Sequence, residues 1–78
     1  MAAPDLRTPE ALARAVDEAA DCYRQGRLED ADKICTRVLK AAPDWFDALH
    51  LAGLVKLEAG KAAAAQGLLA KALKLNPN

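Results

Sequence analysis

The chain has 78 residues, a length that allows one small domain and leaves no room for a catalytic domain beside a binding domain. Hydrophobic residues make up 53% and charged residues 28% of the chain, a composition that predicts a folded helical protein and excludes a disordered tail. Eleven basic and eleven acidic residues cancel, so the sequence offers no simple electrostatic case for binding nucleic acid or anionic lipid.

Residues 1–8 are expected to form an N-terminal tail, and residues 9–78 a single repeat domain. The first five residues lack the basic start and apolar stretch of a signal peptide, and no apolar run approaches the length of a membrane span. A cytoplasmic location and the absence of a membrane partner are therefore the expectations.

The first helix is expected near residues 9–25. Thr8 supplies a capping hydroxyl, and Pro9 suits the first turn of a helix. The apolar residues follow the three-and-four spacing of one helix face. They are Leu12, Ala15, Val16, Ala19, Cys22 and Tyr23.

A second helix is predicted after Gly26, with acidic residues early and basic residues late, as the helix dipole prefers. Its inward positions are Leu28, Ala31, Ile34, Cys35, Val38 and Leu39. Pro43 ends this helix because proline cannot continue it.

A third helix is predicted after Asp44, which is the expected cap, and it is apolar on nearly every side. A helix of this kind is packed on more than one side, which suits the third of four stacked helices. The fourth helix is expected at about residues 62–75. Gly67 lies inside it without a turn to explain it, so the close approach of another backbone is expected there.

The chain repeats itself with a period of 34 residues. The pairs are Gly26 and Gly60, Ala31 and Ala65, Leu39 and Leu73, and Pro43 and Pro77. Each glycine ends a helix in a conformation that glycine adopts without steric cost, and each proline stops a hairpin.

With these landmarks the chain resembles two tetratricopeptide repeats, at about residues 12–45 and 46–78. The matching positions in the second copy are Leu49, Ala52, Gly53, Ala65, Leu69 and Pro77. Those in the first copy are Ala15, Glu18, Ala19, Ala31, Cys35 and Pro43. The resemblance implies an all-α fold of two helix-turn-helix hairpins, stacked as a short right-handed α-solenoid.

The resemblance also implies a non-catalytic scaffold or adaptor that binds a protein or peptide in the groove of its first and third helices. The expected groove residues are Val16, Ala20, Tyr23, Asp47, His50, Leu54 and Leu57. None of them is a basic residue of the kind that clamps a peptide carboxylate in this family, so binding of chaperone tails is not expected.

Two alternatives stay open. Stacked repeats normally need three or more units, so the fourth helix has a face that a further element would cover, and self-association is one way to cover it. The residues expected on that face are Leu68, Leu73 and Leu75. The other alternative is a regulatory region of a transferase-type enzyme, because residues 47–53 are similar to repeat arrays that precede glycosyltransferase or sulfotransferase domains in bacterial proteins.

No motif in the sequence predicts an enzyme, a cofactor or a metal site. His50 and Asp47 would share a helix face, but they lack a nucleophile to activate. Cys22 and Cys35 fall on facing helices of the first hairpin, and small buried thiols are the expectation for them, with a redox role as the minor alternative.

Overall fold

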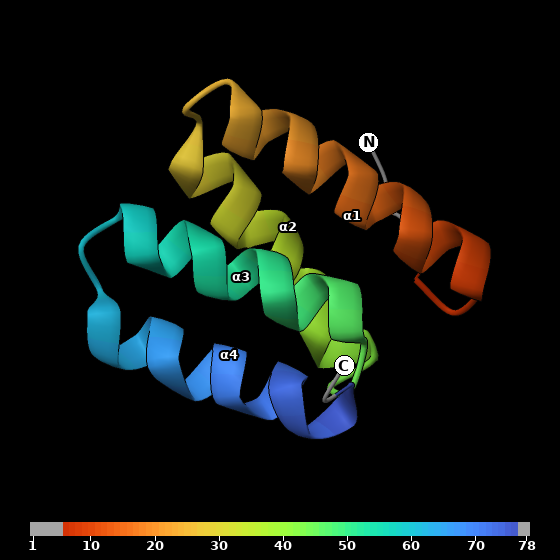
Figure 1. The fold of residues 1–78 in the computed structure, drawn as a ribbon. Helices are drawn as coiled ribbons and strands as arrows, with labels where there is room; N and C mark the ends of the chain where they lie inside the picture. Colours follow the sequence, from red (N-terminus) through yellow and green to blue (C-terminus); the bar gives the residue numbers. More distant parts are fainter. Residues whose placement is uncertain (1–5, 77–78) are drawn as a thin grey trace.

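The computed structural model describes residues 6–76, and this part of the chain forms four α-helices and no strand. The helices are α1 (Pro9–Arg24), α2 (Leu28–Ala41), α3 (Phe46–Glu58) and α4 (Ala62–Leu75). Successive helices run antiparallel, so that α1 and α2 form one hairpin and α3 and α4 a second hairpin beside it (Figure 1). The all-α prediction of two stacked helical hairpins is confirmed, and α4 has the predicted bounds.

The turns inside the two hairpins have the same backbone structure. Gly26 and Gly60 have φ angles of 78° and 79°, in the left-handed region where glycine is favoured. The next residue closes each turn: Arg27 N–H donates to the Cys22 carbonyl at 2.8 Å, and Lys61 N–H donates to the Lys56 carbonyl at 2.8 Å. This bond is the signature of a Schellman cap, and it recurs with the 34-residue period of the sequence.

The two hairpins begin differently. In α1 the Thr8 side chain accepts a hydrogen bond from Ala11 N–H at 3.1 Å, as the sequence predicts. The prediction that Asp44 caps α3 is wrong, because the cap residue is Trp45 and it makes no side-chain capping bond. A turn in which Trp45 N–H donates to the Ala42 carbonyl places the indole against the core, and the Asp44 carboxylate instead pairs with Lys71 Nζ at 3.4 Å.

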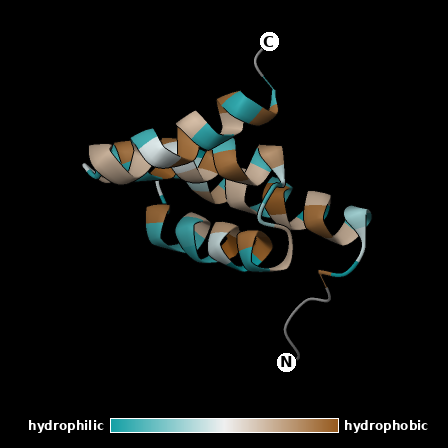
Figure 2. Cartoon of the chain, turned by 90° about the horizontal axis from the view of Figure 1, so that it is seen from below, coloured by the Kyte–Doolittle hydropathy of each residue, from teal (hydrophilic) through white to brown (hydrophobic). Residues whose placement is uncertain are grey.

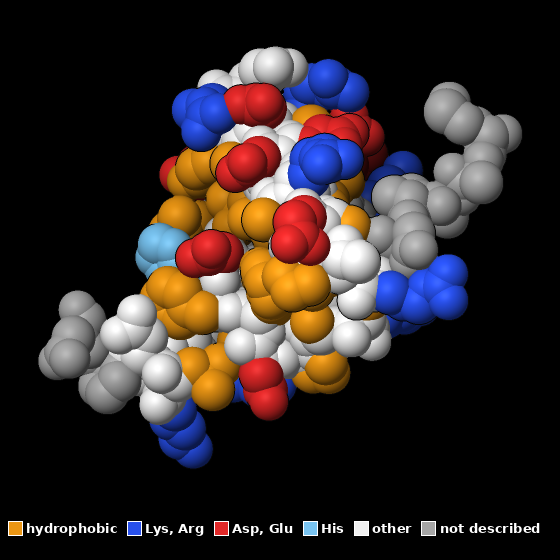
Figure 3. All heavy atoms as spheres, turned by 90° about the vertical axis from the view of Figure 1, so that its right-hand side faces the viewer, with side chains coloured by type: hydrophobic (Ala, Val, Ile, Leu, Met, Phe, Trp, Pro, Cys, Tyr) orange, Lys and Arg blue, Asp and Glu red, His pale blue; other side chains and the backbone are white. Residues whose placement is uncertain are grey.

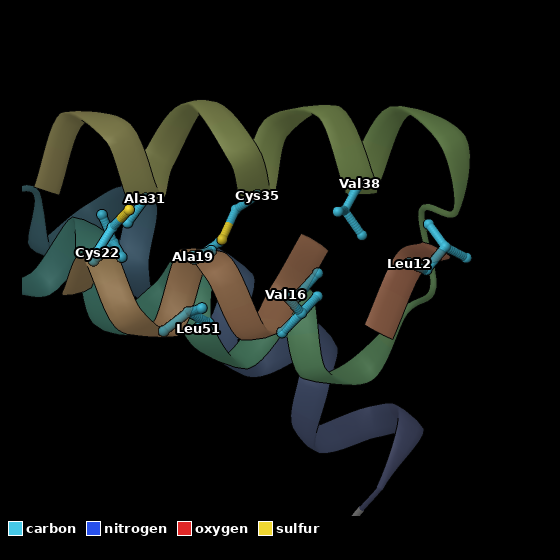
Figure 4. Packing of buried hydrophobic residues seen from close by; sticks show 11 residues of the cluster. Leu12, Val16, Ala19, Cys22, Ala31, Cys35, Val38 and Leu51 are labelled. Atoms are coloured by element: carbon cyan, nitrogen blue, oxygen red, sulfur yellow. The ribbon is translucent and has the colours of Figure 1, made fainter. Parts of the chain in front are cut away.

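The core between the hairpins is built from small and medium side chains (Figure 4). Its buried members are Leu12, Val16, Ala19, Cys22, Ala31, Cys35, Val38, Ala48, Leu51, Ala52 and Val55. Leu28, Ile34 and Leu39 pack against this cluster and are half-buried.

Helix α3 is the centre of the stack, since it packs against α1, α2 and α4, whereas α1 and α4 do not touch (Figure 1). Its buried residues lie around most of its circumference: Ala48, Leu49, Leu51, Ala52, Gly53 and Val55. This confirms that the all-round apolar pattern of α3 reflects packing on more than one side.

The close helix approach in the second hairpin is at Gly53 and not at Gly67. A Cβ atom at Gly53 would lie 2.6 Å from both Cγ and Cδ2 of Leu69, so only glycine fits opposite this leucine. A Cβ atom at Gly67 would meet nothing within 4 Å, and Gly67 is exposed. The expectation of a close approach at Gly67 is therefore wrong, because its side of α4 faces solvent.

Candidate functional site

The expected groove residues of α1 and α3 differ widely in exposure. Val16 belongs to the hydrophobic core and is only 9% exposed, so it presents no surface to a ligand. Ala20, Tyr23 and Leu54 are half-buried. The exposed members are Asp47, His50 and Leu57, all on α3.

His50 forms a small aromatic surface with Phe46, one turn earlier on α3. The two rings are stacked, with centroids 6.0 Å apart and planes 4° from parallel. Hydrophobic side chains surround the histidine on the molecular surface, and acidic side chains lie on the same face (Figure 3). The arrangement offers a flat apolar contact with a hydrogen-bonding edge, which suits contact with a peptide.

The largest exposed apolar side chains lie at the α4 end of the stack. Leu57 is 52%, Leu73 61% and Leu75 46% exposed. Strongly hydrophobic segments are visible along α4, the helix that leads to the C-terminus in Figure 2. Leu68, by contrast, packs against the core, so only part of the expected α4 face is free.

Beside these leucines the surface forms a shallow groove of about 450 Å³ between the end of α3 and the length of α4. We refer to it as the α4 groove. It is lined by Leu57, Ala62, Ala65, Gln66, Leu69, Ala70 and Leu73. Its lining is thus almost entirely apolar, with one amide side chain.

The repeat period explains where the α4 groove comes from. Six of its residues lie 34 positions after residues of α2: Ala62 after Leu28, Ala65 after Ala31, Gln66 after Asp32, Leu69 after Cys35, Ala70 after Thr36, and Leu73 after Leu39. Helix α3 packs over these α2 residues of the first hairpin. Its Lys56 Nζ lies 3.0 Å from Asp32 Oδ1. The α4 groove is therefore the uncovered copy of the surface on which α3 packs. Leu69 and Gln66 were not among the surface residues expected from the sequence, although the 34-residue period identifies them.

The charges around the two surfaces differ. The acidic residues Glu29, Asp30 and Asp32 of α2 are replaced 34 positions later by Ala63, Ala64 and Gln66. Helix α4 contains no acidic residue, and it carries Lys71 and Lys74. Lys61 precedes it directly. The α4 groove itself is therefore lined only by uncharged residues.

The two thiols are placed for packing and not for reaction. Cys22 and Cys35 are both buried and free, and Figure 4 shows Cys22 near Ala31 and Cys35 near Ala19. Burial, with a smaller contribution from the charge of Asp32, raises the pKa of the Cys35 thiol to about 11. A thiol with this pKa stays protonated at neutral pH and is a poor nucleophile.

Residues 6–76 contain no cluster of three or more His, Cys, Asp or Glu side chains that could hold a metal ion. No helix in this range is long and apolar enough to cross a membrane.

Comparison of the sequence with protein-family models and with curated proteins finds no match. The fold and the exposed surfaces are therefore the basis for a functional proposal.

Proposed function

We propose that the chain is a non-catalytic protein–protein interaction module of the tetratricopeptide kind, which binds a protein partner at the open end of its helical stack. The observation that supports this most is the α4 groove, flanked by Leu57 and Leu73 with more than half of each side chain exposed. Contiguous apolar surface beside polar residues is typical of interaction sites in soluble domains.

The architecture supplies a physical reason for binding at this place. Each hairpin of a repeat stack buries an apolar face against the next one, and among residues 6–76 nothing covers that face of α4. A partner that covers Leu57, Leu69 and Leu73 removes apolar area from water, which stabilises a complex by about 25 cal/mol per Å² of that area before the costs of association.

A second surface is favoured by a separate observation. The half-buried Phe46 ring stacks on the exposed His50 ring at the start of α3, beside the exposed Asp47. This face is the second candidate for peptide binding.

Affinity capture from the source cell with matched variants tests the proposal and separates the two surfaces. We expect capture by the wild type and by His50→Ala, and loss of capture by the double variant Leu57→Asp/Leu73→Asp. Both leucines are mostly exposed, so the double variant should retain its helical circular dichroism. Loss with His50→Ala alone would move the site to the α1 and α3 face, and capture unaffected by any of these changes would contradict both surfaces.

A further inference from the structure

We propose that α4 is a hinged helix, which leaves α3 as a unit about the turn at Gly60 while α1, α2 and α3 stay packed together. This conformational change belongs to the fold of the chain, and it is argued from contacts among the described residues. It holds whether or not the α4 groove binds a partner.

Helix α4 buries less apolar side chain than the other three helices. In the part of the chain that the structure describes, it packs only against α3 (Figure 1). Its buried residues are two alanines, Ala65 and Ala72. Helix α1 buries larger side chains, among them Leu12 and Val16. Because burial of apolar area is the main favourable contribution to folding, α4 is the helix that the fold holds least firmly.

The other contacts of α4 are partly exposed. Leu69 lies opposite Gly53 but is only half-buried. Lys71 pairs with Asp44 at 3.4 Å, and the two side chains are 47% and 74% exposed, so this ion pair contributes little to stability. These contacts set the position of α4 on α3, but they add less than fully buried contacts would.

The sequence of α4 also limits its stability as a separate helix. Its cap residue, Lys61, makes no side-chain capping bond, and its first turn contains no acidic residue. In α1, by contrast, the Thr8 hydroxyl caps the helix and Glu10 lies in the first turn. The alanines at the start of α4 favour a helix, but Gly67 opposes it, and a helix of 14 residues is marginal in isolation. We therefore expect α4 to lose its helical hydrogen bonds when it leaves α3.

Departure of α4 leaves the main core intact. All eleven buried members of the core cluster lie on α1, α2 and α3. The main cost is at Leu49, which is 2% exposed and lies one turn before Gly53 on the face of α3 that α4 covers. Because this cost is confined to one helix face, α4 opens with a smaller free energy than the whole chain unfolds.

The turn at Gly60 supplies the hinge. Residues 58–61 are all exposed, and a Cβ atom at Gly60 would meet nothing within 4 Å, so rotation there disturbs no packed side chain. The α4 groove has one wall at Leu57 of α3 and the other at Leu69 and Leu73 of α4. The groove therefore exists only while α4 is closed.

Native-state hydrogen exchange of the full chain, followed residue by residue at low urea concentrations, tests the hinge. We expect the interior amides of α4 to be at least about tenfold less protected than those of α3. Their exchange should also depend less on urea, because the opening exposes less surface than global unfolding does. Equal protection and equal urea dependence in the two helices would overturn the inference.

Two substitutions at exposed positions separate the local opening from global unfolding. Thr8→Ala removes the cap of α1, so it should speed exchange in α3 about fivefold and leave exchange in α4 unchanged, because α1 is folded in both states of α4. Gly67→Ala should slow exchange in α4 about fivefold, because alanine stabilises only the closed helix. An equal effect of Thr8→Ala on both helices, or no effect of Gly67→Ala on α4, would overturn the hinge. No partner is present in this experiment, so its outcome is separate from that of the capture experiment.

Discussion

Gly53 and Leu69 form a pair whose sizes are matched across the second hairpin. Leu69 lies 34 residues after Cys35, and Gly53 lies 34 residues after Ala19. In the first hairpin Ala19 and Cys35 are both fully buried and lie near each other in Figure 4. The second hairpin has a larger residue on one helix and a smaller one on the other, which keeps the helices at a similar separation.

The two glycines inside helices should therefore respond to alanine in opposite directions. Gly53→Ala should destabilise the protein by about 1–3 kcal/mol, because the new Cβ atom clashes with Leu69. Gly67→Ala should stabilise it by about 1 kcal/mol, because Gly67 is exposed and the helix gains propensity without a clash. Urea denaturation measures both changes.

A double variant provides the control. Gly53→Ala/Leu69→Cys recreates the pair found in the first hairpin, so it should recover part of the stability lost in Gly53→Ala. If Leu69→Cys makes Gly53→Ala worse, the size-matching explanation is wrong.

The Cys35 thiol should make stability depend on alkaline pH. An unfolded thiol loses its proton near pH 9, and the folded Cys35 thiol loses it near pH 11. Between these values the folded state binds more protons, so the stabilisation present below pH 9 is lost as the pH rises, by at most about 1.4 kcal/mol per pH unit. The urea midpoint of the wild type should therefore fall between pH 9 and 11 more steeply than that of Cys35→Ala, which lacks this thiol. Parallel curves would show that the Cys35 thiol is not the cause.

At the scale of elements, the two hairpins share their turn but not their helix starts. The turns at Gly26 and Gly60 have nearly equal φ angles and the same closing hydrogen bonds, so their geometry is independent of the surrounding side chains. The starts of α1 and α3 differ because one is capped by the Thr8 hydroxyl and the other follows a turn that places Trp45 against the core.

Alanine in either turn should be destabilising by a similar amount. Gly26→Ala and Gly60→Ala each place a Cβ atom at a left-handed residue, which costs about 1–2 kcal/mol. Neither Cβ atom would meet another group within 4 Å, so backbone strain is the whole effect. Asparagine tolerates this conformation better, and Gly60→Asn should therefore lie between wild type and Gly60→Ala in thermal unfolding. An asparagine variant no more stable than the alanine variant would contradict this.

At the scale of the whole molecule, the two ends of the stack have opposite character. The outward face of α1 carries charged residues at the positions where α3 carries its buried stripe. The outward face of α4 carries the apolar lining of the α4 groove. Among the described residues, charged side chains therefore face outward at α1 and apolar side chains face outward at α4.

The contact between the hairpins can be tested through its ion pair. Lys56 and Asp32 are both partly buried, so Lys56→Glu places two carboxylates together and should cost about 1 kcal/mol. Adding Asp32→Lys restores opposite charges and should recover most of that loss in a double-mutant cycle. Additive losses in the double variant would mean that the two side chains do not interact in solution.

Much of the fold could be predicted because its signals are local. The bounds of α4, the start of α1 at Pro9 and the turns at Gly26 and Gly60 depend on periodicity and on residues with special backbone freedom. The predictions that were wrong failed because of packing between different parts of the chain. The Asp44 carboxylate could cap a helix, but Trp45 packs against the core and α3 begins at Phe46, one residue later than predicted.

The candidate site was predicted less well than the fold. The sequence placed Val16 in a groove and Leu68 on a free face, but the first is in the core and the second packs against it. The spacing of residues along a helix defines its faces, but it does not say which face a neighbouring helix covers. Leu73, which was expected on the outward face of the fourth helix, is exposed there.

The sequence by itself determined the four helices, the two glycine turns and the 34-residue period, because each depends on interactions within a few residues along the chain. Only the tertiary structure decided that Gly53 is the point of close approach, that charged residues cover the outer face of α1, and that an apolar groove lies beside α4. These features depend on which helix faces which, and that choice is made by the fit of side chains far apart in the sequence.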